Sequence, residues 1–240
     1  MIIWLASYPK SGNTWVRFFI LSLLFGNKTE INLNHLKSIE QFPSKSQFAG
    51  LELDITNLRE VAKNWITVQK KINLSKKVRF YKTHNTLCQI DKNRFTDQQN
   101  TLGAIYIVRD PRNVITSVKN HFNHNSYEEA KNFIFDEKRV VLLSRPTDQK
   151  DYSLPQIIGS WQTHYKTWKI MNKNFLLSLL LISKKPTKLL KLDLDLLSTF
   201  LNLIVLSIKF ISSPTFKLAI ISLDKMLFIN ILRIRRLKPK

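Results

Sequence analysis

The sequence is poor in cysteine, glycine and acidic side chains. Cys88 is the only cysteine among 240 residues, which excludes an internal disulfide and a zinc site built from several cysteines. Only five glycines are present, and none follows Gly159. Asp and Glu number 17 against 38 Lys and Arg, so the formal net charge is +21. This excess favours anionic partners such as nucleotides, nucleic acid or an anionic lipid surface.

Long uninterrupted apolar segments are also missing. No window reaches the roughly 18 apolar residues that a membrane-spanning helix needs, and the nearest one, at 196–208, is ended by Lys209. The first residues, "MIIWLASYP", have no basic segment before a short apolar run, unlike a secretory signal. A lone cysteine is typical of a reducing compartment. We therefore expect a cytoplasmic protein.

The composition changes near Phe175. Residues 175–240 contain no Gly, Glu, Gln, His, Tyr, Trp or Cys, and Leu fills 19 of those 66 positions. Their apolar residues come in blocks such as "FLLSLLLIS", with neither a helical nor an alternating period. We divide the chain into one domain at 1–174 and a Leu/Ile/Ser/Lys-rich tail at 175–240, which we expect to be irregular or helical.

The first 174 residues alternate strand-like and helix-like segments. Continuous apolar runs predict buried strands at 2–8, 78–84 and 102–110. Apolar residues at helical spacing predict helices at 14–25, 57–72, 111–122, 127–137 and 154–171. Strands that alternate with helices indicate a parallel sheet in an α/β layer architecture.

The stretch "ASYPKSGNTW", residues 6–15, lies between the first strand and the first helix. A glycine-containing turn before a helix directs several backbone N–H groups at one point, and the positive end of the helix dipole adds to them. Lys10 adds a full charge, while Ser11 and Thr14 add hydroxyl groups. The stretch therefore predicts a phosphate site, although the common G-x-x-x-x-G-K-[ST] loop and the G-x-G-x-x-G loop are both absent.

Three segments together resemble the sulfotransferases that use PAPS (3′-phosphoadenosine 5′-phosphosulfate). "YPKSGNTW" is similar to their 5′-phosphosulfate loop, "YKTH" at 81–84 to the segment with their catalytic histidine, and "YIVRDPRNVITSVKNHF" at 106–122 to their 3′-phosphate segment. The resemblance covers about residues 1–174. It implies a three-layer α/β fold like that of P-loop NTPases, with a central parallel sheet flanked by helices.

The resemblance also implies roles for single residues. His84 would be the base that takes the acceptor proton, supported by Lys10 and Lys82. The 5′-phosphate would be held by Lys10, Ser11, Gly12, Asn13 and Thr14, adenine by Trp15, and the 3′-phosphate by Arg109 and Ser117. PAPS would be the donor and PAP (3′-phosphoadenosine 5′-phosphate) the product. The acceptor would be a small-molecule, carbohydrate or lipid hydroxyl, or an amine, and no metal is predicted.

The sequence departs from this family around Phe175, and it has no glycine after Gly159. The family's late Arg-Lys-Gly segment, which closes over the 3′-phosphate, is missing, so donor binding and activity are expected to be impaired. One hypothesis is that the tail arose from a frameshift or a degenerated gene. Translating the encoding DNA in its other two reading frames tests this hypothesis.

Two other classes of function compete with this interpretation. A P-loop nucleotide kinase or NTPase shares the strand–loop–helix arrangement, but the missing Gly-Lys-Ser/Thr ending argues against it. A non-catalytic basic protein that binds nucleic acid or anionic membrane would suit the net charge. The basic end "LRIRRLKPK" predicts contact with a membrane surface, whereas no recognised nucleic-acid module is present and no nucleic acid is expected.

Overall fold

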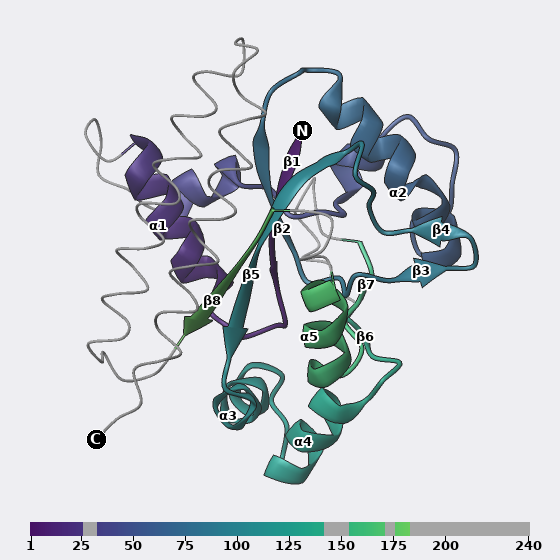
Figure 1. The fold of residues 1–240 in the computed structure, drawn as a ribbon. Helices are drawn as coiled ribbons and strands as arrows, with labels where there is room; N and C mark the ends of the chain where they lie inside the picture. Colours follow the sequence, from purple (N-terminus) through teal and green to yellow (C-terminus); the bar gives the residue numbers. More distant parts are fainter. Residues whose placement is uncertain (26–32, 142–153, 171–175, 183–240) are drawn as a thin grey trace. The chain divides into compact units, whose positions relative to one another are not determined.

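A computed structural model describes residues 1–25, 33–141, 154–170 and 176–182 (Figure 1). Most of the predicted tail lies outside these described residues, and only 176–182 belong to them. The apolar run at 196–208 and the basic end of the chain also lie outside.

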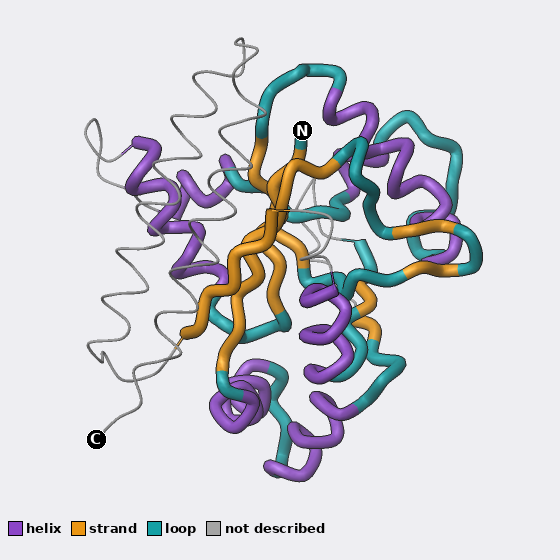
Figure 2. The backbone as a smooth tube through the Cα atoms, in the orientation of Figure 1, coloured by secondary structure: helices purple, strands orange, loops and turns teal. Residues whose placement is uncertain are grey.

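Four parallel strands form the central sheet, in the order β2-β1-β5-β8 (Figure 2). Their bounds are β1 Ile2–Ser7, β2 Arg79–Thr83, β5 Thr101–Arg109 and β8 Leu176–Ile182. Strand β1 pairs with β2 on one side and β5 on the other, so Ala6 lies between Thr83 and Tyr106. The predicted parallel sheet is therefore confirmed. Strand β8 continues it past the change in composition, so the expectation of an irregular or helical tail is wrong for residues 176–182.

Helices flank the sheet, with α1 on one side and α2 and α5 on the other (Figure 1). The helices are α1 Asn13–Phe25, α2 Leu58–Asn73, α3 Pro111–His121, α4 Tyr127–Phe135 and α5 Trp161–Ile170. Short elements are the 3₁₀ helices η1 Leu33–Ser38 and η2 Lys45–Phe48, and two antiparallel pairs, β3 Gln89–Ile90 with β4 Asn93–Arg94 and β6 Val140–Val141 with β7 Gln156–Ile157. The three-layer α/β fold is as predicted.

The helix predicted at 154–171 was wrong in its first part, because α5 begins only at Trp161. Pro155 has no N–H to give to a helix, and Gly159 has a φ of +57°, outside the right-handed helical region. Residues 156 and 157 instead pair with β6. The described helices include none that is long and apolar enough to cross a membrane.

Strand β1 is buried on both faces, as expected for the middle of a parallel sheet. Trp4 is the centre of an aromatic cluster with Phe42 and Phe95, at ring-centroid distances of 5.3 and 5.1 Å. Its indole N–H donates to the Thr101 hydroxyl over 2.8 Å, so its one polar atom is satisfied in the core. The rigid strand fixes the point from which the loop at residues 8–12 leaves the sheet.

Candidate functional site

The three predicted segments meet at one edge of the sheet. Each follows the carboxyl end of a strand: the loop at 8–12 follows β1, His84 follows β2, and Arg109 ends β5. Ligand sites of open parallel sheets lie at this edge. Direct contacts join the segments, because His84 Nδ1 lies 2.7 Å from the Ser7 carbonyl and Arg109 donates to the Lys10 carbonyl over 2.8 Å.

The loop before α1 has an unusual backbone. Lys10 and Gly12 have φ angles of 66° and 99°, in the left-handed region. For Lys10 this conformation costs about 1 kcal/mol, and the bond from Arg109 to its carbonyl stabilises it. Helix α1 begins at Asn13, so the N–H groups of its first turn have no partner within the helix. Ser11 is 1% exposed, and no described group bonds its hydroxyl oxygen.

Asn13 is buried and faces the sheet. Its amide nitrogen donates to the Leu5 carbonyl over 2.9 Å and to the Ser7 hydroxyl over 3.1 Å. The side chain therefore fixes the first turn of α1 against the end of β1, a role that the sequence analysis did not predict. Thr14 and Trp15 are exposed, and Trp15 stacks on Phe19 at 5.9 Å with parallel rings.

His84 has a defined tautomer. The Ser7 carbonyl can only accept, so Nδ1 of His84 carries the proton and donates to it, while the Ser7 hydroxyl lies 3.2 Å from the same nitrogen. Nε2 therefore keeps its lone pair, and no described group bonds it. Burial, and next the charge of Lys82, hold the pKa of His84 well below its usual value, so the ring is neutral at neutral pH.

Lys82 lies in β2, two residues before His84. Its ammonium donates to the Gln41 side-chain oxygen over 2.8 Å. The backbone around Gln41 also pairs with Lys82, since Lys82 N–H donates to the Glu40 carbonyl and Phe42 N–H to the Lys82 carbonyl, both over 2.8 Å. Burial, and next the charges of Arg17 and Lys10, lower the pKa of Lys82 to about 8.

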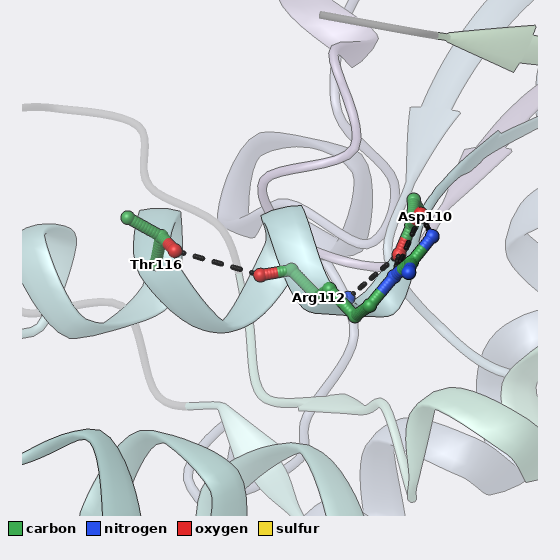
Figure 3. Close-up of polar contacts among 3 residues, drawn as sticks. All are labelled: Asp110, Arg112 and Thr116. Carbon is green, nitrogen blue, oxygen red and sulfur yellow. Dashed lines mark hydrogen bonds and ion pairs between the residues drawn. The ribbon is translucent and has the colours of Figure 1, made fainter.

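Arg109 and Arg112 differ in their hydrogen-bond partners. Arg112 is paired with Asp110 through bonds of 2.6 to 3.1 Å at the start of α3, and its side chain is 88% exposed (Figure 3). In Figure 3 the Arg112 carbonyl also accepts from Thr116, one turn along α3. Arg109 has no carboxylate partner among the described residues and contacts the Lys10 loop.

Ser117 is on the second turn of α3, partly buried, and no described group bonds its hydroxyl. His121 follows it by four residues and so shares its face of the helix. The pKa of His121 is lowered by burial and by the charge of Lys10. The loop with Lys10 therefore lies close to the side of α3 that carries Ser117.

The site is rich in cations that have no carboxylate partner among the described residues. The pKa of Lys10 is lowered by burial and by Arg109, and the charges that lower the pKa of Lys82 are again cations, with no carboxylate contributing. Mutual repulsion of this kind is relieved by a bound anion. Within the described part of the chain, no three His, Cys, Asp or Glu side chains gather in a way that could hold a metal ion.

Sequence reasoning missed four residues around His84. Ser7, Gln156 and His164 bond its ring or its backbone, and Tyr106 bonds His164. His84, His164 and Gln156 come from separate parts of the chain. No local pattern could have grouped them.

Two solved structures match part of the chain: mouse sulfotransferase SULT7A1 complexed with PAP (TM-score 0.47, 18% identity) and retinol dehydratase in a complex with retinol and PAP (TM-score 0.46, 15% identity). Each match covers 83% of this chain but only 58% or 59% of the other, so the chain spans about three fifths of their length. No curated protein matches in sequence. The model of the sulfotransferase domain matches residues 2–180, three quarters of the chain with all three segments of the site, and the chain therefore belongs to the sulfotransferase domain family.

Proposed function

We propose that the chain is a sulfotransferase that uses PAPS as donor and transfers the sulfuryl group to a hydroxyl or amine acceptor. One observation carries the proposal. Among the residues that the structure describes, none bonds the Nε2 lone pair of His84, and no carboxylate pairs with Lys10, Lys82 or Arg109 at the same sheet edge. A proton acceptor beside unpaired cations suits the transfer of an anionic group to an acceptor that must lose a proton.

The residues present fit an adenylate with two phosphate groups. The free N–H groups at the start of α1, the unbonded Ser11 hydroxyl and Lys10 would hold the 5′-phosphate. Arg109 and Ser117 would hold the 3′-phosphate, because a guanidinium bonds phosphate with two parallel N–H groups and the Ser117 hydroxyl is unengaged. The exposed ring of Trp15 offers a face for adenine.

PAPS supplies the sulfuryl group, whose bond to the phosphate oxygen is replaced by a bond to the acceptor oxygen or nitrogen. His84 takes the acceptor proton at Nε2, and its Nδ1–H remains bonded to Ser7. The charge that forms on the imidazole is then shared with the Ser7 carbonyl. Lys10 and Lys82 stabilise negative charge on the leaving side, which favours a loose transition state. We propose a small-molecule, carbohydrate or lipid hydroxyl as acceptor.

Calorimetric titration with PAP tests the donor site. Lys10→Met removes one charge-assisted contact, worth about 1.5–3 kcal/mol, so PAP affinity should fall about 10- to 100-fold. Lys63→Met is the matched control, because Lys63 is exposed on α2 and the same lysine-to-methionine change is made there. It should leave the affinity within about two-fold.

AMP, which lacks only the 3′-phosphate, separates the proposal from a nucleotide kinase. PAP should bind at least 10-fold tighter than AMP, since Arg109 and Ser117 then have a ligand. Equal affinity for AMP and PAP, or PAP binding that Lys10→Met does not weaken, would contradict the donor site. Release of PAP from PAPS in a screen of hydroxyl and amine acceptors tests the reaction, and His84→Ala should abolish it.

A further inference from the structure

His164 is a buried histidine on α5 that the proposed chemistry does not use. It is 0% exposed, and both ring nitrogens have partners. Nδ1 lies 2.8 Å from the Tyr106 hydroxyl, and Nε2 lies 3.1 Å from the backbone carbonyl of His84. Its ring also stacks on that of Tyr106, with centroids 5.6 Å apart. The contacts therefore link β5 through α5 to the residue after β2.

The direction of each bond follows from the chemistry. The His84 carbonyl can only accept, so Nε2 of His164 carries the proton and donates to it. Nδ1 then accepts from the Tyr106 hydroxyl. Burial lowers the pKa of His164 to about 3 and raises that of Tyr106, so both groups stay neutral over the working pH range. The His84 carbonyl thus selects the tautomer of His164, and the Tyr106 hydroxyl satisfies the other ring nitrogen.

His84 is held at every hydrogen-bonding group except one. Its N–H donates to the Gln156 side-chain oxygen over 2.8 Å, its carbonyl accepts from His164, and its Nδ1–H donates to Ser7 over 2.7 Å. These partners come from β7, α5 and β1 respectively. Nε2 alone is left over, and it is the atom that must meet the acceptor.

The next residue, Asn85, is also hydrogen-bonded to α5 and β7. The Asn85 carbonyl accepts from the Trp168 indole N–H over 2.9 Å, and its side-chain oxygen accepts from Ile157 N–H over 2.8 Å. The segment after β2 therefore cannot rotate about His84 without breaking bonds to both α5 and β7. In a site where a displacement of about 1 Å can cost about 100-fold in rate, such bracing has a direct effect on turnover.

We propose that His164, whose Nδ1 is satisfied by Tyr106, is a positioning residue that holds the His84 backbone so that Nε2 faces the acceptor. The proposal rests on the proposed function for its link to turnover, but its structural part does not. His164 touches neither donor nor acceptor in this scheme. Its loss should lower kcat and leave PAP affinity unchanged.

Three variants test this inference. His164→Leu removes the donor to the His84 carbonyl, and His164→Gln keeps an N–H donor at the end of the side chain. Gln69→Leu is the matched control, because Gln69 is also 0% exposed with two buried bonds, to the Phe95 carbonyl and the Thr96 hydroxyl. It loses a comparable number of contacts away from His84.

We expect His164→Leu to lower kcat about 10- to 100-fold, with PAP affinity within about two-fold of the wild type, and His164→Gln to recover most of kcat. Gln69→Leu should keep kcat despite its lower stability. Equal kcat in His164→Leu and the wild type, or an equal loss in Gln69→Leu, would overturn the proposal. If His164→Leu does not fold, Tyr106→Phe replaces it, and a smaller loss of kcat in the same direction is expected.

Nitrogen-15 NMR of the histidine rings gives a readout that needs no acceptor. The Nδ1–H of His84 should exchange with water at least about 10-fold faster in His164→Leu than in the wild type, because the local structure opens more often. Unchanged exchange would overturn the positioning role even where no turnover is found. If exchange increases but no variant or wild type uses PAPS, the proposed function fails and the bracing of His84 stands.

Discussion

Replacing Lys82 by Met should make the protein more stable while it removes activity. Burial and neighbouring cations lower the pKa of Lys82 from 10.5 to about 8, so the folded state holds this charge at a cost of up to about 3 kcal/mol. The variant loses the bond from the ammonium to the Gln41 side chain, worth about 1.5–3 kcal/mol. The net gain in the free energy of unfolding at pH 7 is therefore up to about 1.5 kcal/mol.

The gain should depend on pH in a defined direction. Because the pKa of Lys82 is lower in the folded than in the unfolded state, the unfolded chain binds more protons between pH 8 and pH 10.5. The free energy of unfolding of the wild type therefore rises with pH across that window. The destabilisation caused by the buried Lys82 charge reaches its full size only below about pH 8. The difference between Lys82→Met and the wild type should shrink as the pH rises from 7 to 10.

Urea unfolding of both proteins at pH 7 and pH 9.5 measures this difference. Lys63→Met serves as the control for removing one exposed positive charge and should change the free energy of unfolding by less than about 0.5 kcal/mol. A Lys82→Met variant that is less stable than the wild type at pH 7, or a gain that is the same at both pH values, would refute the reasoning. Loss of turnover in a more stable variant would mark Lys82 as a residue kept for function.

Two further predictions concern the anion site and its support. Arg109→Ala should weaken PAP binding at least about 10-fold, whereas Arg112→Ala should stay within about two-fold, because Arg112 is already paired with Asp110; calorimetry that shows equal losses would contradict this division. Asn13→Ala should lower the free energy of unfolding by about 1–3 kcal/mol, since two bonds to the end of β1 are lost; a urea midpoint equal to that of the wild type would rule out this support.

The sequence determined the parts of the site that depend on neighbouring residues. A buried strand, a Lys-Ser-Gly turn and a helix at 2–25 predict a phosphate loop, because strand burial, positive φ and the free N–H groups of a helix start are all local properties. The sequence also placed His84 and Arg109 at the carboxyl ends of two predicted strands, in a sheet predicted to be parallel. In a parallel sheet these ends necessarily meet.

Only the tertiary structure decided which groups fix those residues. The tautomer of His84 depends on Ser7, 77 positions away, and its backbone on Gln156 and His164, 72 and 80 positions away. The Asn13 side chain likewise bonds to Leu5 and Ser7 because the packing of α1 on β1 buries it. A hydrogen bond between distant segments requires only that the donor and the acceptor come close in the folded protein. It leaves no periodic pattern in the sequence, so it cannot be predicted before the packing of the sheet and helices is known.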